Sequence, residues 1–117
     1  MITALQETIE EKVLDEGTKH DQDKVTLELI PPEAELGLGK ALSYGAKKYG
    51  RRNIEKGMDW DRAYGAARRH MLAWYSGEDK DPESGLSHLY HALANLAFLT
   101  MFQDRGIGKD NRPRRKD

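Results

Sequence analysis

The most strongly apolar stretch of the chain covers residues 83–102, and its pattern predicts a core helix. From Leu86 onward, apolar side chains recur on every side of a helical wheel, so most of this helix should be buried within the domain or an oligomer. One polar line interrupts it, because His88, His91 and Asn95 are spaced i, i+3 and i+7 and share one face. Buried imidazole and amide groups cost free energy unless they are hydrogen-bonded. We therefore expect this line to face another protein group, water, a metal or a ligand.

Apolar positions at helical spacing predict three further helices, over residues 2–17, 31–50 and 59–77. The second of them is rich in glycine and alanine; its glycines cost helix propensity and would let another backbone or a flat ligand come close. Residues 25–30 alternate apolar and polar positions, which we interpret as an extended arm packed on helices. The predicted fold class is all-α: a small bundle of about four helices with a short extended N-terminal arm, completed by oligomerisation.

Length and composition narrow the class of protein. At 117 residues the chain suits one domain, which we place at residues 1–104, followed by a basic, disordered tail at 105–117. Cysteine is absent, so disulfide and thiolate chemistry are excluded, which suits a cytoplasmic protein. No secretory signal and no apolar run of about 20 residues is visible, so we expect no membrane insertion. The tail lacks a recognition motif, and nucleic acid is not an expected partner.

Four carboxylates, those of Glu78, Asp79, Asp81 and Glu83, lie within six residues at the start of the apolar helix. Asp81 followed by Pro82 is typical of a helix start, and an acid in the first turn is favoured by the helix dipole. Each feature alone needs no functional role. Carboxylates combined with an inward line of histidines, however, are what a divalent metal or a proton-transfer site requires.

Cations gather at the end of the second predicted helix and in the loop that follows. Residues 47–53 contain two lysines and two arginines beside Tyr49 and Asn53. The helix dipole accounts for some of these cations, but the group is typical of a phosphate site. Elsewhere, Lys24 could contact a phosphate, and residues 68–70, which include Arg69 and His70, could face the histidine line.

Several short stretches, in this order and spacing, resemble a family of small, mostly phage-encoded dATP/dGTP diphosphohydrolases of the MazZ type, over about two thirds of the chain. The matching stretches are Asp21-Gln22-Asp23-Lys24, Leu29-Ile30-Pro31-Pro32-Glu33, Tyr44-Gly45-Ala46-Lys47-Lys48-Tyr49-Gly50, Arg69-His70-Met71-Leu72-Ala73-Trp74, Gly77-Glu78-Asp79-Lys80-Asp81-Pro82-Glu83-Ser84-Gly85-Leu86, and His88-Leu89-Tyr90-His91-Ala92 with Asn95.

The resemblance implies a fold related to the all-α, MazG-like nucleoside triphosphate pyrophosphohydrolases, which hold Mg²⁺ through a Glu-x-x-Glu pair and a Glu-x-x-Asp pair on neighbouring helices. This sequence does not show that tetrad. Glu78 and Asp81 have the second spacing but sit in a loop, and the core helix offers His88-x-x-His91 instead. Either the metal site is built differently, or metal-dependent hydrolysis is not the function.

The leading hypothesis is hydrolysis of a purine deoxynucleoside triphosphate, dGTP or dATP, to the monophosphate and pyrophosphate. Under this hypothesis the cofactor is Mg²⁺ or Mn²⁺. The protein is expected to be a homo-oligomer, a dimer or tetramer, in the host cytoplasm. We expect the metal at Glu78, Asp81 and Glu83, and catalysis by His88, His91 and Glu83. The expected substrate-binding residues are Lys24, Lys48, Tyr49, Arg51, Asn53, Arg69, His70 and Asn95.

Two other readings stay open. The same cations and small-residue helix would serve a nucleotide-binding protein without turnover, for instance a phage protein that sequesters a signalling nucleotide. Such a protein has no need of carboxylates around a metal, so the missing tetrad favours it. The third reading is a helical oligomerisation domain whose polar line is only a buried network.

Overall fold

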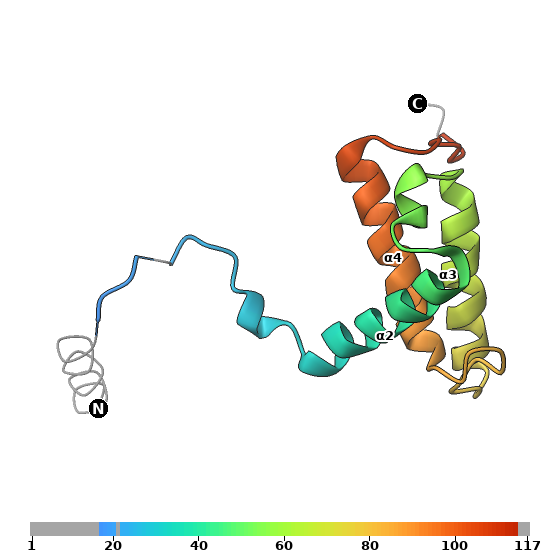
Figure 1. Cartoon of the computed structure of the whole chain (residues 1–117), viewed down its shortest axis with the longest axis horizontal. Coiled ribbons are helices and arrows are strands. Elements are labelled where there is room, and N and C mark those ends of the chain that lie inside the picture. The colour runs from blue at the N-terminus through green and yellow to red at the C-terminus, as the bar shows by residue number, and fades with distance from the viewer. Residues whose placement is uncertain (1–16, 21, 115–117) are drawn as a thin grey trace.

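The computed structural model describes residues 17–20 and 22–114, and three α-helices form its body (Figure 1). These helices are α2 (Pro32–Tyr49), α3 (Trp60–Tyr75) and α4 (His88–Arg105), accompanied by two short 3₁₀ helices, η1 (Leu27–Leu29) and η2 (Asn53–Lys56). The described residues contain two isolated β-bridges and no strand. The predicted all-α class is therefore confirmed, with three α-helices, and the helix predicted over residues 2–17 falls almost entirely outside the described residues. None of the described helices has the length and apolar character needed to cross a bilayer.

Small side chains let the three helices approach closely. In Figure 1, α3 and α4 run antiparallel, and α2 crosses them; α4 contacts both of the other helices. The buried apolar residues are Ala41 on α2, Ala63 and Ala67 on α3, and Ala92, Ala94 and Phe102 on α4. The predicted close approach at a glycine is found at Gly37, where an added Cβ would overlap the ring of Tyr90 on α4. The same α4 leaves Leu89 and Leu96 exposed, so one side of it is uncovered in the single chain.

The core helix begins later than the sequence predicts. α4 starts at His88, and its N-cap is Ser87, whose Oγ accepts a hydrogen bond from the backbone N–H of Leu89 at 3.1 Å. Asp81 does not start a helix, although it makes the local bonds that make aspartate a good cap. Its Oδ1 accepts the backbone N–H groups of Glu83 (2.7 Å) and Ser84 (3.2 Å), which closes a turn.

The prediction that residues 25–30 form an extended arm packed on helices is wrong. The described segment before α2, residues 17–20 and 22–31, is called the arm below. Residues 27–29 form η1, and Figure 1 shows this part of the chain leading away from the three helices. Val25, Leu27 and Leu29 are 83%, 67% and 77% exposed. An alternating pattern indicates one apolar face, but it does not say whether a surface of the same chain covers that face.

The segment after α4 lies against the start of α3. The backbone N–H of Trp60 donates to the carbonyl oxygen of Lys109 at 2.9 Å, and the indole Nε1–H donates to that of Ile107 at 2.9 Å. Asn111 Oδ1 accepts the backbone N–H of Asp61. This packing differs from the disordered tail that the sequence predicts from residue 105.

Candidate active site

A polar site forms where α3 ends and α4 begins, at the end of the bundle that α2 also reaches. The connection between them, residues 76–87, carries the four carboxylates and is called the acidic loop below. Backbone hydrogen bonds fold it back on itself: Asp81 N–H to Leu86 O (2.8 Å), Gly85 N–H to Asp81 O (2.7 Å) and His88 N–H to Asp79 O (2.9 Å). This turn brings loop carboxylates beside the first turn of α4.

Three histidines from two helices gather there: His70 of α3 with His88 and His91 of α4, called the histidine cluster below. The Nδ1 atoms of His70 and His88 are 2.9 Å apart. The rings of His70 and His91 stack, with centroids 4.7 Å apart and an angle of 18° between their planes. The expectation that His70 could face the His88 line is confirmed, and each residue of the polar line has a partner, although only His88 is fully buried.

A carboxylate fixes the orientation of His88, which is only 4% exposed. Glu78 Oε1 lies 2.7 Å from His88 Nε2. A carboxylate accepts, so the Nε2–H of His88 donates this bond. In the neutral ring the remaining nitrogen, Nδ1, then carries a lone pair, and it is aimed at His70.

His91 is held by the acidic loop on one side and by α2 on the other. Its Nε2 is 2.6 Å from Ser84 Oγ, and its ring meets the edge of Tyr44 with centroids 5.9 Å apart. Asn95, expected to orient a histidine or read a base, donates its amide N–H to the backbone oxygen of His91 at 2.9 Å. Its amide nitrogen thus bonds within α4 and not to an imidazole.

The charges of the site follow from burial and hydrogen bonding. Burial lowers the pKa of both His70 and His91, and for His70 the neighbouring His91 lowers it further. Burial alone would raise the pKa of Asp81, but the backbone N–H groups of Ser84 and Glu83 hold it below its usual value. At neutral pH, Asp81 is therefore an anion and His70 and His91 are neutral, with ring lone pairs available for a proton or a cation.

Glu83, expected to be both a metal ligand and a catalytic residue, is instead engaged with α2. Lys48 Nζ donates to its Oε1, and this bond is the main cause of a lowered Glu83 pKa and a raised Lys48 pKa. The nearby Tyr44 hydroxyl also lowers the pKa of Glu83. Besides Glu78, which bonds to His88, Asp81 is the described carboxylate that joins the histidine cluster, with Oδ2 at 3.7 Å from His70 Nδ1.

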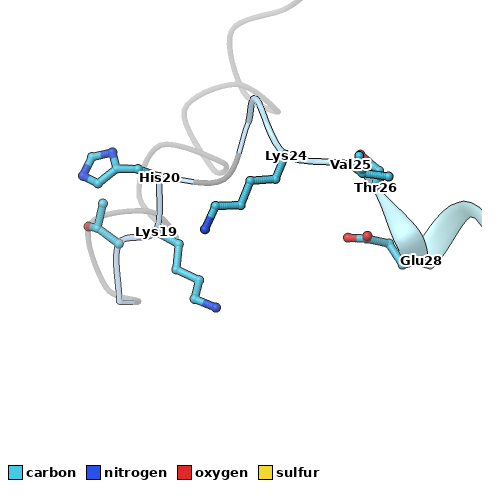
Figure 2. A pocket seen from close by; sticks show the side chains of 7 residues that line it. Lys19, His20, Lys24, Val25, Thr26 and Glu28 are labelled. Atoms are coloured by element: carbon cyan, nitrogen blue, oxygen red, sulfur yellow. The ribbon is translucent and has the colours of Figure 1, made fainter. Parts of the chain in front are cut away.

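The remaining predicted substrate-binding residues are spread over the molecule. Lys24 lies on the arm, where it lines a pocket of about 460 Å³ with six neighbours, Thr18, Lys19, His20, Val25, Thr26 and Glu28 (Figure 2). Asn53 belongs to η2, and Glu55 of η2 accepts a hydrogen bond from Arg105, the last residue of α4. His88 of the histidine cluster is the first residue of that helix. An 18-residue helix is about 27 Å long. The phosphate site predicted at residues 47–53 is thus divided, with Lys48 near the histidine cluster and Asn53 held toward the other end of the bundle.

Three further predicted residues lie on the surface. Tyr49 is exposed, with the Lys48 amine over its ring. Arg51 and Arg69 are exposed as well, and in the part of the chain that the structure describes they make no hydrogen bond or ion pair with the histidine cluster.

A groove of about 630 Å³ runs along α2 beside the site. It is lined by Glu35, Leu36, Gly39, Lys40, Ser43, Tyr44 and Lys47 of α2 and by Ser84 and Leu86 of the acidic loop. Sequence reasoning missed Tyr44 and Ser84, which contact both the groove and His91. Tyr44 lies four residues before Lys48 and so shares its helix face, a signal that could have found it. Ser84 sits in a turn, where no periodicity points to it.

Fold and site together define a small all-α protein with a histidine–carboxylate cluster beside a groove that lysines line. Residues 15–112 match the family described as dATP/dGTP diphosphohydrolase, N-terminal, and the chain belongs to this family. Over 96 residues, 82% of the chain, it is 35% identical to a dATP/dGTP diphosphohydrolase of Salmonella phage PMBT28, and it spans about 33% of that relative's length. No solved structure matches.

Proposed function

We propose that the protein hydrolyses dATP or dGTP to the deoxynucleoside monophosphate and pyrophosphate. The observation that carries this proposal is the family match, because residues 15–112 contain every residue of the histidine cluster and of the groove. In the reaction, water attacks the α-phosphorus, the bond from that phosphorus to the oxygen bridging to the β-phosphate breaks, and pyrophosphate leaves.

The groove suits a nucleotide in size and chemistry. Leu36, Leu86 and the bare backbone of Gly39 offer an apolar wall for a flat base, while Lys40 and Lys47 offer positive charge for phosphates. Lys47 lines the groove, whereas Lys48 is paired with Glu83. Tyr44 and Ser84 both line the groove and contact His91, so a phosphate bound beside them would lie next to His91.

His91 is the best-placed proton acceptor for the attacking water. Its lowered pKa keeps it neutral at neutral pH, and Ser84 and Tyr44 hold its ring beside the groove. A positioned general base contributes typically 10²–10⁴-fold to a rate. We assign this role to His91, and the role of positioning it to Ser84.

The carboxylate site expected for Mg²⁺ does not fit the observed side chains. Glu78 bonds to His88, and Glu83 bonds to Lys48, so two of the three predicted ligands have other partners. The group that does converge holds two imidazole nitrogens, whereas Mg²⁺ prefers an all-oxygen shell. We therefore derive no catalytic step through Mg²⁺.

The proposed active form is a homo-oligomer, because exposed apolar side chains on the arm and on α4 need a partner surface to cover them. We also propose that it acts in the host cytoplasm. The first experiment incubates purified protein with dATP, dGTP, ATP and GTP, each with Mg²⁺, Mn²⁺ or Co²⁺, and quantifies products by ion exchange. We expect monophosphate and pyrophosphate in equal amounts from a deoxypurine substrate. His91→Gln should lower kcat at least about 100-fold, whereas His20→Gln, a change on the arm, should not.

Two results would contradict the proposal. Release of orthophosphate would show a different bond cleavage. A melting temperature that rises with dGTP or dATP, without consumption under any metal, would favour a protein that binds the nucleotide and does not turn it over.

A further inference from the structure

Three potential ligand atoms converge at the end of α3 and α4. They belong to His70, Asp81 and His88, and all lie within 4.8 Å of one another. We propose that these residues bind one divalent transition-metal ion of the Mn²⁺, Fe²⁺ or Co²⁺ kind, in preference to Mg²⁺. The proposal rests on the positions of these atoms and does not need the nucleotide chemistry proposed above.

The type of donor selects the ion. Imidazole suits first-row transition ions, and carboxylate oxygen suits Mn²⁺ and harder ions, so two imidazoles with one carboxylate fit the middle of this range. Mg²⁺ loses its hydration water reluctantly and prefers oxygen ligands. The set is therefore a poor Mg²⁺ site and a good transition-metal site.

The surroundings of His88 are those of a metal ligand. Glu78 accepts the Nε2–H of His88 at 2.7 Å, which fixes the tautomer and points the Nδ1 lone pair at His70. A carboxylate on the far nitrogen of a metal-bound histidine orients the ring and raises its basicity. With a side chain that is 54% exposed, Glu78 is not needed to fill the core, so an orienting role accounts for its position.

The spacing of the two imidazoles fits octahedral coordination. Two nitrogens that are 2.9 Å apart and each about 2.1 Å from one ion subtend an angle of about 90° at it. A tetrahedral ion such as Zn²⁺ would hold them farther apart. Three protein ligands would leave open positions for water or a phosphate oxygen.

A metal-free hydrogen bond from one histidine to the other explains only part of the arrangement. It would satisfy the two Nδ1 atoms, but it gives no partner to Oδ2, the second oxygen of the Asp81 carboxylate. Asp81 Oδ1 accepts two backbone N–H groups, whereas among the described residues Oδ2 accepts no hydrogen bond and lies 3.7 Å from His70 Nδ1. A cation between the rings and Oδ2 accounts for all three atoms.

The test is a Co²⁺ titration of the full chain after EDTA treatment, without nucleotide, followed by visible absorption. We expect ligand-field bands that saturate at one Co²⁺ per chain and that Mn²⁺, but not an equal concentration of Mg²⁺, abolishes. The key variant is Asp81→Asn, because the amide oxygen can still accept the backbone N–H groups of Glu83 and Ser84 while the anionic Oδ2 is lost. It should weaken Co²⁺ binding at least tenfold, and Glu78→Gln should weaken it about 10–100-fold.

Matched controls separate the site from general charge effects. Asp79→Asn removes a neighbouring exposed carboxylate, and His20→Ala removes a histidine on the arm; neither should change Co²⁺ affinity. His88→Ala abolishes binding if it folds, and Asp81→Asn decides the matter if it does not. The proposal is overturned if no bands appear, if Mg²⁺ competes as well as Mn²⁺, or if folded Asp81→Asn and Asp79→Asn bind Co²⁺ equally. Co²⁺ binding without hydrolysis of any nucleotide would support this site while contradicting the proposed function.

Discussion

At the scale of single residues, the Ser84 hydroxyl group orients the ring of His91, the proposed general base. Ser84 Oγ contacts His91 Nε2 at 2.6 Å and also accepts the backbone N–H of Leu86. Ser84→Ala should lower kcat about tenfold, the value of one hydrogen bond of about 1.4 kcal/mol, with KM nearly unchanged because His91 and not Ser84 acts on the reacting water. Steady-state pyrophosphate release measures both constants.

Ser76→Ala is the matched control, since its Oγ bonds only to a helix carbonyl oxygen, that of Leu72, at the other end of the acidic loop. Equal losses in the two variants would mean that the loop as a whole, and not the contact with His91, was disturbed. A KM that rises while kcat is unchanged would place Ser84 in substrate binding instead.

The residues of the site differ in how far the sequence reveals them. His88, His91 and Asn95 share a face by helical period alone, and the structure confirms that this face is partnered. The choice among carboxylates was not predictable. Asp81 joins the histidines and Glu83 joins Lys48 because a backbone turn rotates neighbouring loop residues in different directions, and no periodicity describes that turn.

At the scale of elements, one glycine of α2 sets its distance from α4. A Cβ at Gly37 would overlap the ring of Tyr90, whereas Gly39 of the same helix has open space around it. Gly37→Ala should therefore destabilise the protein by about 1–3 kcal/mol through overpacking. Gly39→Ala should instead stabilise it by up to about 1 kcal/mol through helix propensity. Urea unfolding followed by circular dichroism measures both, and stabilisation by both changes would contradict the close approach.

The attachment of the C-terminal segment to α3 carries a pH dependence. Arg112 bonds through two nitrogens to Asp110, lies over the ring of Trp60, and lowers the pKa of Asp110 to about 2. A lowered carboxyl pKa contributes stability that is complete above the usual value near 4 and is lost as the pH falls toward 2. The difference in stability between the wild type and Asp110→Asn should thus be constant at neutral pH and shrink between about pH 4 and pH 2.

Trp60 fluorescence in a Trp74→Phe background follows this segment, because the indole also bonds to Ile107 O. High salt should reduce the difference at neutral pH, since the pair is exposed. A difference that persisted unchanged at pH 2 would show that Asp110 acts through packing rather than charge.

The sequence predicts which segments form helices better than it predicts the residues at which the helices begin and end. α2 and α3 fall within the predicted ranges because proline, aspartate and glycine mark their ends. α4 begins five residues after the predicted 83, because Asp81 uses the same side-chain bonds to close a turn that it would use to cap a helix. Residues 27–29 form a 3₁₀ turn where alternation predicted an extended arm.

At the scale of the whole molecule, apolar surface is left uncovered. Leu89 and Leu96, spaced by seven on α4, are 39% and 48% exposed, and the arm exposes Val25 and Leu29 still more. The radius of gyration of 20.5 Å exceeds the value of about 13 Å for a compact 100-residue domain. Both observations support the proposed homo-oligomer, in which copies of the chain cover these faces.

Leu96→Glu tests this assembly directly. Burying one leucine contributes about 2 kcal/mol, and a two-fold dimer loses it twice, so the dissociation constant should rise at least about 100-fold. Light scattering after size-exclusion chromatography at several concentrations should show a dimer or tetramer for the wild type and a helical monomer for the variant. Arg62→Gln on exposed α3 surface changes the net charge by the same amount and should leave the assembly intact. A wild type that is monomeric at every concentration would contradict the assembly, and the arm would then remain uncovered in the free protein.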